Sequence, residues 1–523
     1  MMSYIRATPA IRFAVPTLSQ MFLKTGALAL TLLLTSRLTG LWRESVQAAT
    51  FGATGMGDVA VLMLTFPDWI TGILVSGAMA YVLLPHWAGQ TALERTQTQR
   101  RVGQWLLATA VALGVLLVIL RQPLAHLLAS GLAPGLQTMA QEGLIWSAMA
   151  LPAAFMAALG IARLQCEQDF VGMYAASVVV NGALIVSLYL LSVEAVATHA
   201  VVILGLALCS AMALRLVWVH VRLPAPAKQA WRRTPGVFAP LPMPSVWLWA
   251  ALSSGLPLTL PLVARSFSSA YGEGGLSTFN YAWKMVELPL ILAIQLVATL
   301  AFPSISQALA AEAPGYPRLS GKARQAVRDA LILAWTLACA AVAALQIGAP
   351  AIASLLFGWG RMPAERLADI AAWGSAGAWG LLPQAVIAVA LTVLASQRRM
   401  GLAVVAYAGA LVFLLICGIL VPSDGIWLMY SLNGVLAGVA MVMLYALVKN
   451  TPGTRWNLSL LPVTALGIPS LALLVFDLAL RFGDTARLPV GDLNGLWLSF
   501  SAAGGILLFS YTFGGELRAA LRR

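Results

Sequence analysis

The stretch that decides the fold of this chain is residues 35–85, TSRLTGLWRESVQAATFGATGMGDVAVLMLTFPDWITGILVSGAMAYVLLP. Arg37, Arg43 and Glu44 lie at the far end of one apolar segment, and Asp58 lies at the start of the next. Segments this apolar are typical of membrane spans. Charge within a span is costly, so it usually marks a substrate path or a buried ion pair. We therefore interpret the remaining chain as a scaffold around these charges.

The composition excludes a soluble globular protein. Hydrophobic residues make up 60% of the 523 residues and charged residues only 10%, whereas ordinary soluble domains carry about a quarter charged residues. Four cysteines, at positions 166, 209, 339 and 417, stand singly in or beside apolar runs, which predicts small core residues and not a zinc site or a disulfide framework. Residues 1–20 lack the apolar core of a cleaved signal peptide, so we expect the first span to direct insertion.

Windows long enough to cross about 30 Å of hydrocarbon predict fourteen spans and thus an all-α multi-pass membrane protein. Along the chain, the first six spans form one set, the next six form a second set, and two more spans follow. They are centred in 23–46, 57–86, 102–121, 138–163, 170–191, 197–219, 246–270, 276–306, 327–348, 367–396, 401–421, 425–448, 457–480 and 491–512.

The basic residues predict the orientation of these spans. With the N-terminus in the cytoplasm, 23 of the 32 Lys and Arg residues lie in the tails, in the cytoplasmic connections or at their edges, as the positive-inside rule requires. The net charge of +13 therefore reflects topology and not a nucleic-acid partner. The nine others, in spans or on the outer side, are Arg37, Arg43, Arg121, Arg265, Lys284, Arg361, Arg366, Arg481 and Arg487.

An internal repeat relates the two sets of six spans. FPDWITGILVSGAMAYVLLP from Phe66 matches LPLILAIQLVATLAFP from Leu288 at an offset of 222. LPAAFMAALGIARLQCEQ from Leu151 matches LPQAVIAVALTVLASQ from Leu382 at an offset of 231. Matched spans six apart run in the same direction, which predicts two parallel-repeat six-helix lobes around a central cavity. The alternative is that Leu-Pro dipeptides recur by chance in an apolar chain.

This pattern divides the chain into five parts. We predict a cytoplasmic N-terminal tail at 1–22, an N-lobe at 23–222, a cytoplasmic linker at 223–245, a C-lobe at 246–449, and two C-terminal spans with a cytoplasmic tail at 450–523.

No motif indicates covalent, metal or nucleotide chemistry. His86, His126, His199 and His220 are isolated, and neither a Walker motif nor H-E-x-x-H nor a nucleophile elbow occurs. We therefore predict a transporter and not an enzyme, without a cofactor or a metal.

Several stretches resemble one known family along nearly the whole chain. They are SRLTGLWRE at 36–44, FGATGMGD at 51–58, YAWKMVELP at 281–289, AFPSIS at 301–306 and IASLLFGWGRMPAERLADIAAW at 352–373. Together they resemble the MurJ (MviN) lipid II flippase family of the multidrug/oligosaccharidyl-lipid/polysaccharide exporter superfamily.

The resemblance implies a flippase in the bacterial inner membrane, and the fourteen spans with their basic residues predict that both termini are cytoplasmic. It would move a polyprenyl-diphosphate-linked sugar, with lipid II as the first candidate, to the outer leaflet by alternating access. Implied partners are this lipid, membrane lipids and cell-envelope synthesis proteins, and the last two spans would line a groove for the lipid tail. Two alternatives stay open, namely an exporter of another lipid-linked oligosaccharide or exopolysaccharide unit and a non-transporting scaffold of an envelope-synthesis complex.

The chain departs from the family pattern at charged positions. Thr71 and Gly72 stand where the family usually has two arginines, and Ser76 stands where an acidic residue usually follows. Trp283 replaces an aspartate, and Lys284 replaces an arginine. These changes remove charge from the expected cavity, and a lysine offers a point charge where arginine offers a bidentate grip on phosphate.

Arg37 and Arg43 are the first candidates for substrate binding. On an ideal helix they lie about 9 Å apart along the axis and about 120° apart around it, so they can hold an extended anion. By resemblance both would bind the diphosphate of the substrate. The alternative is that Arg43 snorkels outward and pairs with Glu44 or Asp58.

Three further positions complete the predicted site. Lys284 and Glu287 are three residues apart on one helix face, which predicts either a structural ion pair or a pair that substrate phosphate breaks. Arg265 is another substrate-binding candidate. Asp58 is a coupling or ion-pair candidate, or it caps the N-terminus of its own span.

Topology is the first testable prediction. Reporter fusions placed after Arg101 and after Arg523 should both report the cytoplasm, because an even number of spans and the basic-residue distribution require it. A periplasmic signal from either fusion would contradict the predicted map.

Overall fold

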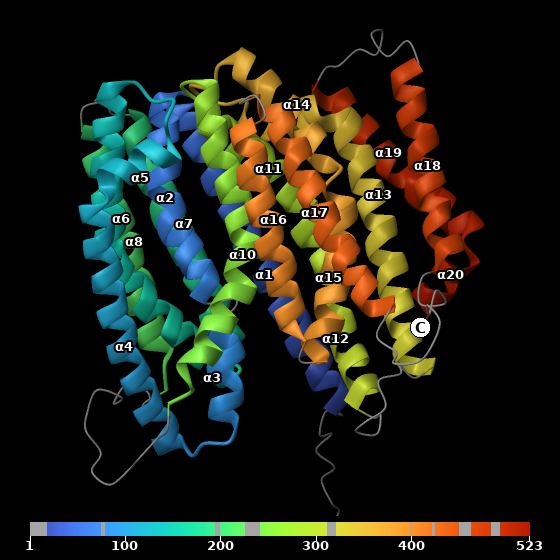
Figure 1. Cartoon of the computed structure of the whole chain (residues 1–523), viewed down its shortest axis with the longest axis horizontal. Helices are drawn as coiled ribbons and strands as arrows, with labels where there is room; N and C mark the ends of the chain where they lie inside the picture. Colours follow the sequence, from blue (N-terminus) through green and yellow to red (C-terminus); the bar gives the residue numbers. More distant parts are fainter. Residues whose placement is uncertain are drawn as a thin grey trace, which may run out of the picture.

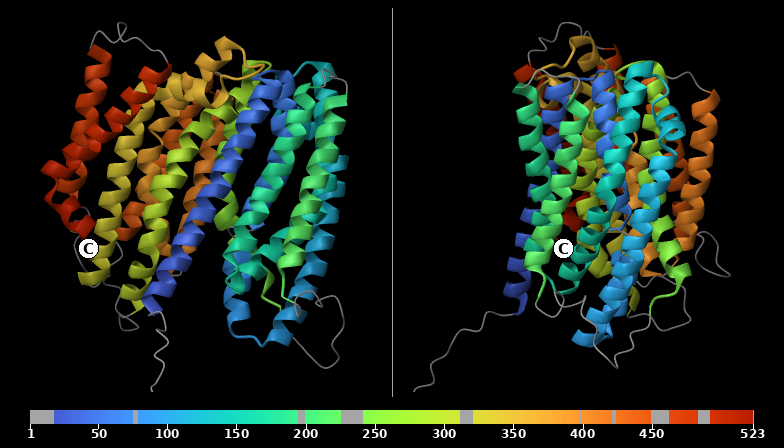
Figure 2. Two further views of the ribbon diagram at one scale, coloured as in Figure 1. Left: turned by 180° about the vertical axis from the view of Figure 1, so that it is seen from behind. Right: turned by 90° about the vertical axis from the view of Figure 1, so that its left-hand side faces the viewer.

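The computed structural model describes residues 18–74, 79–193, 199–224, 241–310, 321–397, 399–420, 424–448, 462–482 and 492–522, and these contain helices but no strands. Twelve of the helices are long and apolar enough to cross a membrane, and one bent pair raises the count to thirteen. The 34-residue α1 runs beside them along the bundle and makes fourteen crossing segments, as predicted (Figure 2).

The first eight helices form the N-lobe. They are α1 (Leu18–Phe51), α2 (Gly55–Ile73), α3 (Met79–Ala88), α4 (Ala92–Ile119), α5 (Arg121–Leu128), α6 (Pro134–Cys166), α7 (Phe170–Val193) and α8 (Ala200–Arg222). α1 packs on α7, and α6 packs on α2, α4 and α8. Because the inward faces are apolar, they bury a core of their own around Met63, Leu144 and Leu204.

The C-lobe has a separate core around Phe279, Cys339 and Leu432. Its helices are α10 (Pro244–Ser268), η4 (Ser269–Tyr271), α11 (Gly275–Pro289), the π-helical η5 (Leu290–Ile294), α12 (Gln295–Ala310), α13 (Gly321–Phe357), α14 (Ala364–Ala378), α15 (Leu381–Ser396), α16 (Met400–Leu420) and α17 (Gly425–Val448). Figure 1 shows the two lobes side by side. Most of the predicted linker lies outside the described residues.

The last helices, α18 (Val463–Phe482), α19 (Asp492–Phe513) and α20 (Gly515–Arg522), pack on the outside of the C-lobe against α13 (Figure 1). The Ser499 hydroxyl donates to the carbonyl of Ala344 over 2.9 Å, and Arg328 pairs with Glu516 over 2.9 Å. The groove for a lipid tail that we expect here stays a prediction.

The repeated spans differ in how they bend. The eighth span changes from an α-helix to the π-helical η5 directly after Pro289, whereas residues 75–78 of its counterpart lie outside the described residues. The fourth span is one helix, α6, whereas its counterpart bends by 49° between α14 and α15. At that bend the Asn433 amide donates to the carbonyl of Ala376 over 2.8 Å. A side chain inserted in this way satisfies a backbone carbonyl where the helix is interrupted, and it accounts for the bend.

Asp58 joins the lobes at the end of the bundle that carries α14. Its carboxylate accepts the backbone N–H groups of Gly274 (2.8 Å) and Ser277 (2.7 Å) and the Ser277 hydroxyl (2.7 Å). The expectation that Asp58 caps its own span is therefore wrong. Thr54 caps α2 by accepting from Gly57, while Asp58 caps α11 of the other lobe. The exposed N–H groups of a helix N-terminus favour such an anion.

Main-chain contacts reinforce this junction, which we call the closed end (residues 49–58, 130–131, 269–277 and 358–366). The Arg361 N–H donates to the carbonyl of Ala49 over 2.9 Å. Gly274 has φ +85°, and a Cβ there would come within 2.2 Å of the Ala53 oxygen. Glycine permits both this dihedral and this close approach. The lobes thus meet here backbone to backbone.

α10 joins the lobes along a second seam. The Ser254 hydroxyl donates to the carbonyl of Ile73 over 3.2 Å, and Val82 of α3 packs on Ala250. Between this seam and α1 lies a cavity lined by polar and apolar side chains of both lobes.

The Asp58 cap should stabilise the contact between the lobes at the closed end, and a cross-link between them measures this. Ser130 and Ser269 come from different lobes with hydroxyl oxygens 3.2 Å apart, so Ser130→Cys with Ser269→Cys, in a chain without its native cysteines, should form a disulfide. Adding Asp58→Asn should slow its formation about fivefold, because a lost cap costs about 1 kcal/mol. Thr54→Ala removes a cap within one lobe and should leave the rate unchanged. Equal rates for all three chains would contradict the assignment.

Candidate functional site

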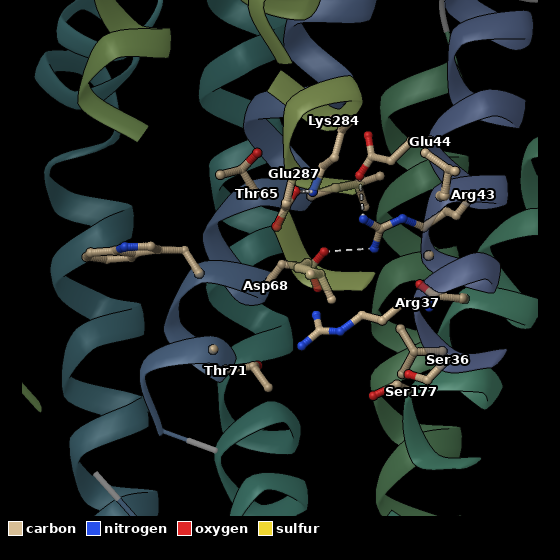
Figure 3. A pocket seen from close by; sticks show the side chains of 18 of the residues that line it. Ser36, Arg37, Arg43, Glu44, Thr65, Asp68, Thr71, Ser177, Lys284 and Glu287 are labelled. Atoms are coloured by element: carbon tan, nitrogen blue, oxygen red, sulfur yellow. Dashed lines mark hydrogen bonds and ion pairs between the residues drawn. The ribbon is translucent and has the colours of Figure 1, made fainter. Parts of the chain in front are cut away.

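A cavity of about 650 Å³ lies between the lobes (Figure 3). Helices α1, α2, α7 and α8 form one wall, and α10, α11 and η5 form the other. All four predicted substrate-binding residues line it, together with Glu287; they are Arg37, Arg43, Arg265 and Lys284. Asp58 does not, since the closed end holds it elsewhere. Residues from α1, α10 and α11, far apart in the sequence, thus meet in one space.

Arg43 is held between two carboxylates. Its guanidinium donates to Glu44 and to Asp68, both over 2.7 Å (Figure 3), and the Arg43 side chain is only 9% exposed. Asn280 of α11 donates to the second oxygen of Glu44 over 3.0 Å. Of the two partners that the alternative named for Arg43, Glu44 is paired with it, whereas Asp58 is not and Asp68 is the second partner. The charge of Arg43 is therefore balanced in this structure.

Lys284 and Glu287 form the expected ion pair, with Nζ 2.7 Å from the carboxylate oxygen. Their side chains are 28% and 29% exposed, so both are accessible from the cavity. A pair of this kind is weaker than a dry one and opens more readily.

Arg37 and Arg265 have no carboxylate partner among the described residues. Arg37 is exposed and reaches from α1 past Ser36 into the cavity (Figure 3). Arg265 donates to a neutral group, the Thr65 hydroxyl, over 2.7 Å. Their positive charge is consequently available to a ligand.

Two charged residues of the cavity were not predicted from the sequence. Arg215 is one of the 23 cations that we counted on the cytoplasmic side, but it is 7% exposed and lines the cavity. Asp68 was not considered, although it stands between Pro67 and Trp69 within an apolar span. That location alone was a sufficient signal, because an acidic residue within a span is a functional candidate by default.

The charges of the cavity do not cancel. Five cations and three carboxylates line it in the described part of the chain, which leaves an excess of two positive charges; they are Arg37, Arg43, Arg215, Arg265, Lys284, Glu44, Asp68 and Glu287. Thr71, Gly72 and Trp283, where the resemblance gives charged residues, also line it and leave their stretches of the wall neutral. The cavity is suited to an anion with an apolar remainder.

The family model for the lipid II flippase MurJ matches residues 47–481. The chain belongs to the MurJ lipid II flippase family. It is accordingly a multi-pass membrane transporter and not an enzyme, and it handles a lipid-linked substrate. No curated protein sequence matches the chain.

Solved structures share the fold of this MurJ-family chain. The lipid II flippase MurJ in an inward closed conformation superposes with a TM-score of 0.74 at 16% identity, over 95% of this chain and 100% of that one. An inward-facing multidrug resistance MATE transporter of the MOP superfamily gives 0.58 at 15% identity, over 80% and 98%. A MOP superfamily transporter from Pyrococcus furiosus gives 0.53 at 19% identity, over 81% and 95%. The predicted all-α, two-lobe fold is confirmed.

The two ion pairs of the cavity should differ in their effect on stability. Glu44→Ala leaves the buried Arg43 with one partner and should lower the free energy of unfolding by about 3 kcal/mol. Glu287→Ala leaves Lys284 in contact with water and should cost about 1 kcal/mol or less. Thermal unfolding of both purified variants in detergent measures the difference. Equal melting temperatures would contradict the assigned difference in burial.

Proposed function

We propose that this MurJ-family chain moves lipid II from the inner to the outer leaflet by holding its diphosphate in the cavity between the lobes. The observation that carries this proposal is that Arg37, Arg43, Arg265 and Lys284 share one cavity. A transporter requires that these charges converge on one cavity, whereas in a scaffold they would be dispersed onto protein contacts.

The charge state of each cation supports a diphosphate ligand. Arg37 and Arg265 have no carboxylate partner among the described residues, and their guanidinium groups can donate two parallel hydrogen bonds to phosphate oxygens. Lys284 becomes available when the pair with Glu287 opens. An entering diphosphate thereby replaces the water around these groups with charge-assisted hydrogen bonds, which offsets the cost of removing its charge from the membrane surface.

Movement of the lobes would carry the substrate across. With the N-terminus in the cytoplasm, the closed end faces the outer side, and the contacts of Asp58 and Arg361 bar exit there. Exit requires these few hydrogen bonds to break while each lobe keeps its own core. Rocking of one repeat against the other is the usual form of alternating access. Cell-envelope synthesis proteins are proposed as partners that supply or receive the lipid.

Arg37 should carry more of the transport than any other single charge. Its guanidinium is exposed in the cavity, and no described residue neutralises it. Arg37→Ala should lower the rate of lipid II flipping in proteoliposomes at least tenfold, because a charge-assisted phosphate contact is lost. Arg37→Lys should recover part of the rate, since it keeps the charge without the bidentate geometry.

A matched control separates the site from a general effect of removing an arginine. Arg481 is 65% exposed and pairs with Asp477 outside the cavity, so Arg481→Ala should flip lipid II at the normal rate. Full activity of Arg37→Ala at equal protein level would remove Arg37 from the site and favour the scaffold.

A further inference from the structure

Arg215 is a buried cation that no part of the preceding mechanism uses. It lies in α8, lines the cavity and is only 7% exposed. Its Nε is buried without a hydrogen-bond partner, and no ion pair or hydrogen bond satisfies its guanidinium within the described part of the chain. A buried, unpaired arginine is costly unless a ligand completes it.

The cavity that Arg215 lines also holds a carboxylate that is already engaged. Asp68 accepts from Arg43 over 2.7 Å, and Arg215 and Arg265 line the same cavity. Three arginines from α1, α8 and α10 thus share one cavity with this carboxylate. The Asp68 side chain is 41% exposed, so this cluster opens onto the cavity.

We infer that Arg215 binds the diphosphate of the substrate and that Asp68 is the internal carboxylate with which this diphosphate competes. The inference rests on the proposed function, and it adds a residue from α8 to a site otherwise built on α1, α10 and α11. A carboxylate and a phosphate attract a guanidinium through the same oxygen geometry. Asp68 therefore marks the place of one phosphate and holds the arginines near it while the cavity is empty of lipid.

This assignment also provides specificity for a diphosphate. A polyprenyl monophosphate has one anionic group and can be held by Arg37 and Arg265 alone. A diphosphate offers a second group, and Arg215, on the opposite wall from Arg265, is the remaining cavity cation that has no direct partner among the described residues. Arg215 consequently contributes to the affinity for the diphosphate and little to that for the monophosphate.

Binding to the full-length protein in nanodiscs tests the assignment. The probes are lipid II and a polyprenyl diphosphate and monophosphate of equal chain length. Arg215→Gln should weaken both diphosphates about tenfold, the usual effect of losing one charge-assisted hydrogen bond, and should change the monophosphate less than twofold. Arg215→Lys should give an intermediate loss. Arg222→Gln is the control, because Arg222 lies on the same helix but pairs with Asp169 over 2.8 Å outside the cavity.

A double-mutant cycle tests the competition with Asp68. Asp68→Asn should strengthen diphosphate binding several-fold when Arg215 is present and clearly less when Arg215→Gln is combined with it, since the effects of residues coupled through one shared site are not additive. If Arg215 had only a structural role, its replacement would lower the melting temperature without changing the ratio of diphosphate to monophosphate affinity.

The outcomes separate the two proposals. If the unsubstituted chain binds lipid II and Arg215→Gln leaves the affinity ratio unchanged, the role of Arg215 is refuted while the proposed function stands. If the unsubstituted chain binds neither lipid II nor the diphosphate, the proposed function is refuted, and the role of Arg215 with it.

Discussion

The structure depends on the need to balance charge inside an apolar bundle. Arg43 is nearly dry, and it is tolerated because Glu44 and Asp68 each accept from it over 2.7 Å. Asn280 of the other lobe then satisfies the remaining oxygen of Glu44. This chain of contacts aligns α1, α2 and α11, so the interactions that stabilise the buried charges also build the wall of the cavity.

The cavity divides its cations into two groups. Arg43 and Lys284 are paired with carboxylates, whereas Arg37, Arg215 and Arg265 have none as a direct partner among the described residues. In the proposed function, the paired residues maintain the geometry of the site, and the unpaired ones supply the attraction for an anion. A transporter benefits from this division, because a site with every charge balanced would bind phosphate weakly, and one with none balanced would be unstable in the membrane.

Each lobe has an apolar core of its own, and a few residues of the closed end, such as Ala53 and Leu276, pack into the core of the opposite lobe. The closed end also contains hydrogen bonds from α11 to Asp58 and from Arg361 to the carbonyl of Ala49. These hydrogen bonds can break and re-form while most of each core stays buried. The architecture therefore allows the lobes to move relative to each other, as alternating access requires.

The sequence by itself determined the membrane class, the fourteen crossing segments, the two-lobe repeat and the family, because long apolar runs and motif order are local properties. It also predicted the pair of Lys284 with Glu287, since three residues on a helix bring side chains to one face. It could not place Asp58, whose partners lie more than two hundred residues away in α11. Nor could it place Arg215 and Asp68. A position on a helix does not show which face looks into a cavity, and only the packing of α8 and α2 in the tertiary structure turned these side chains into the same cavity.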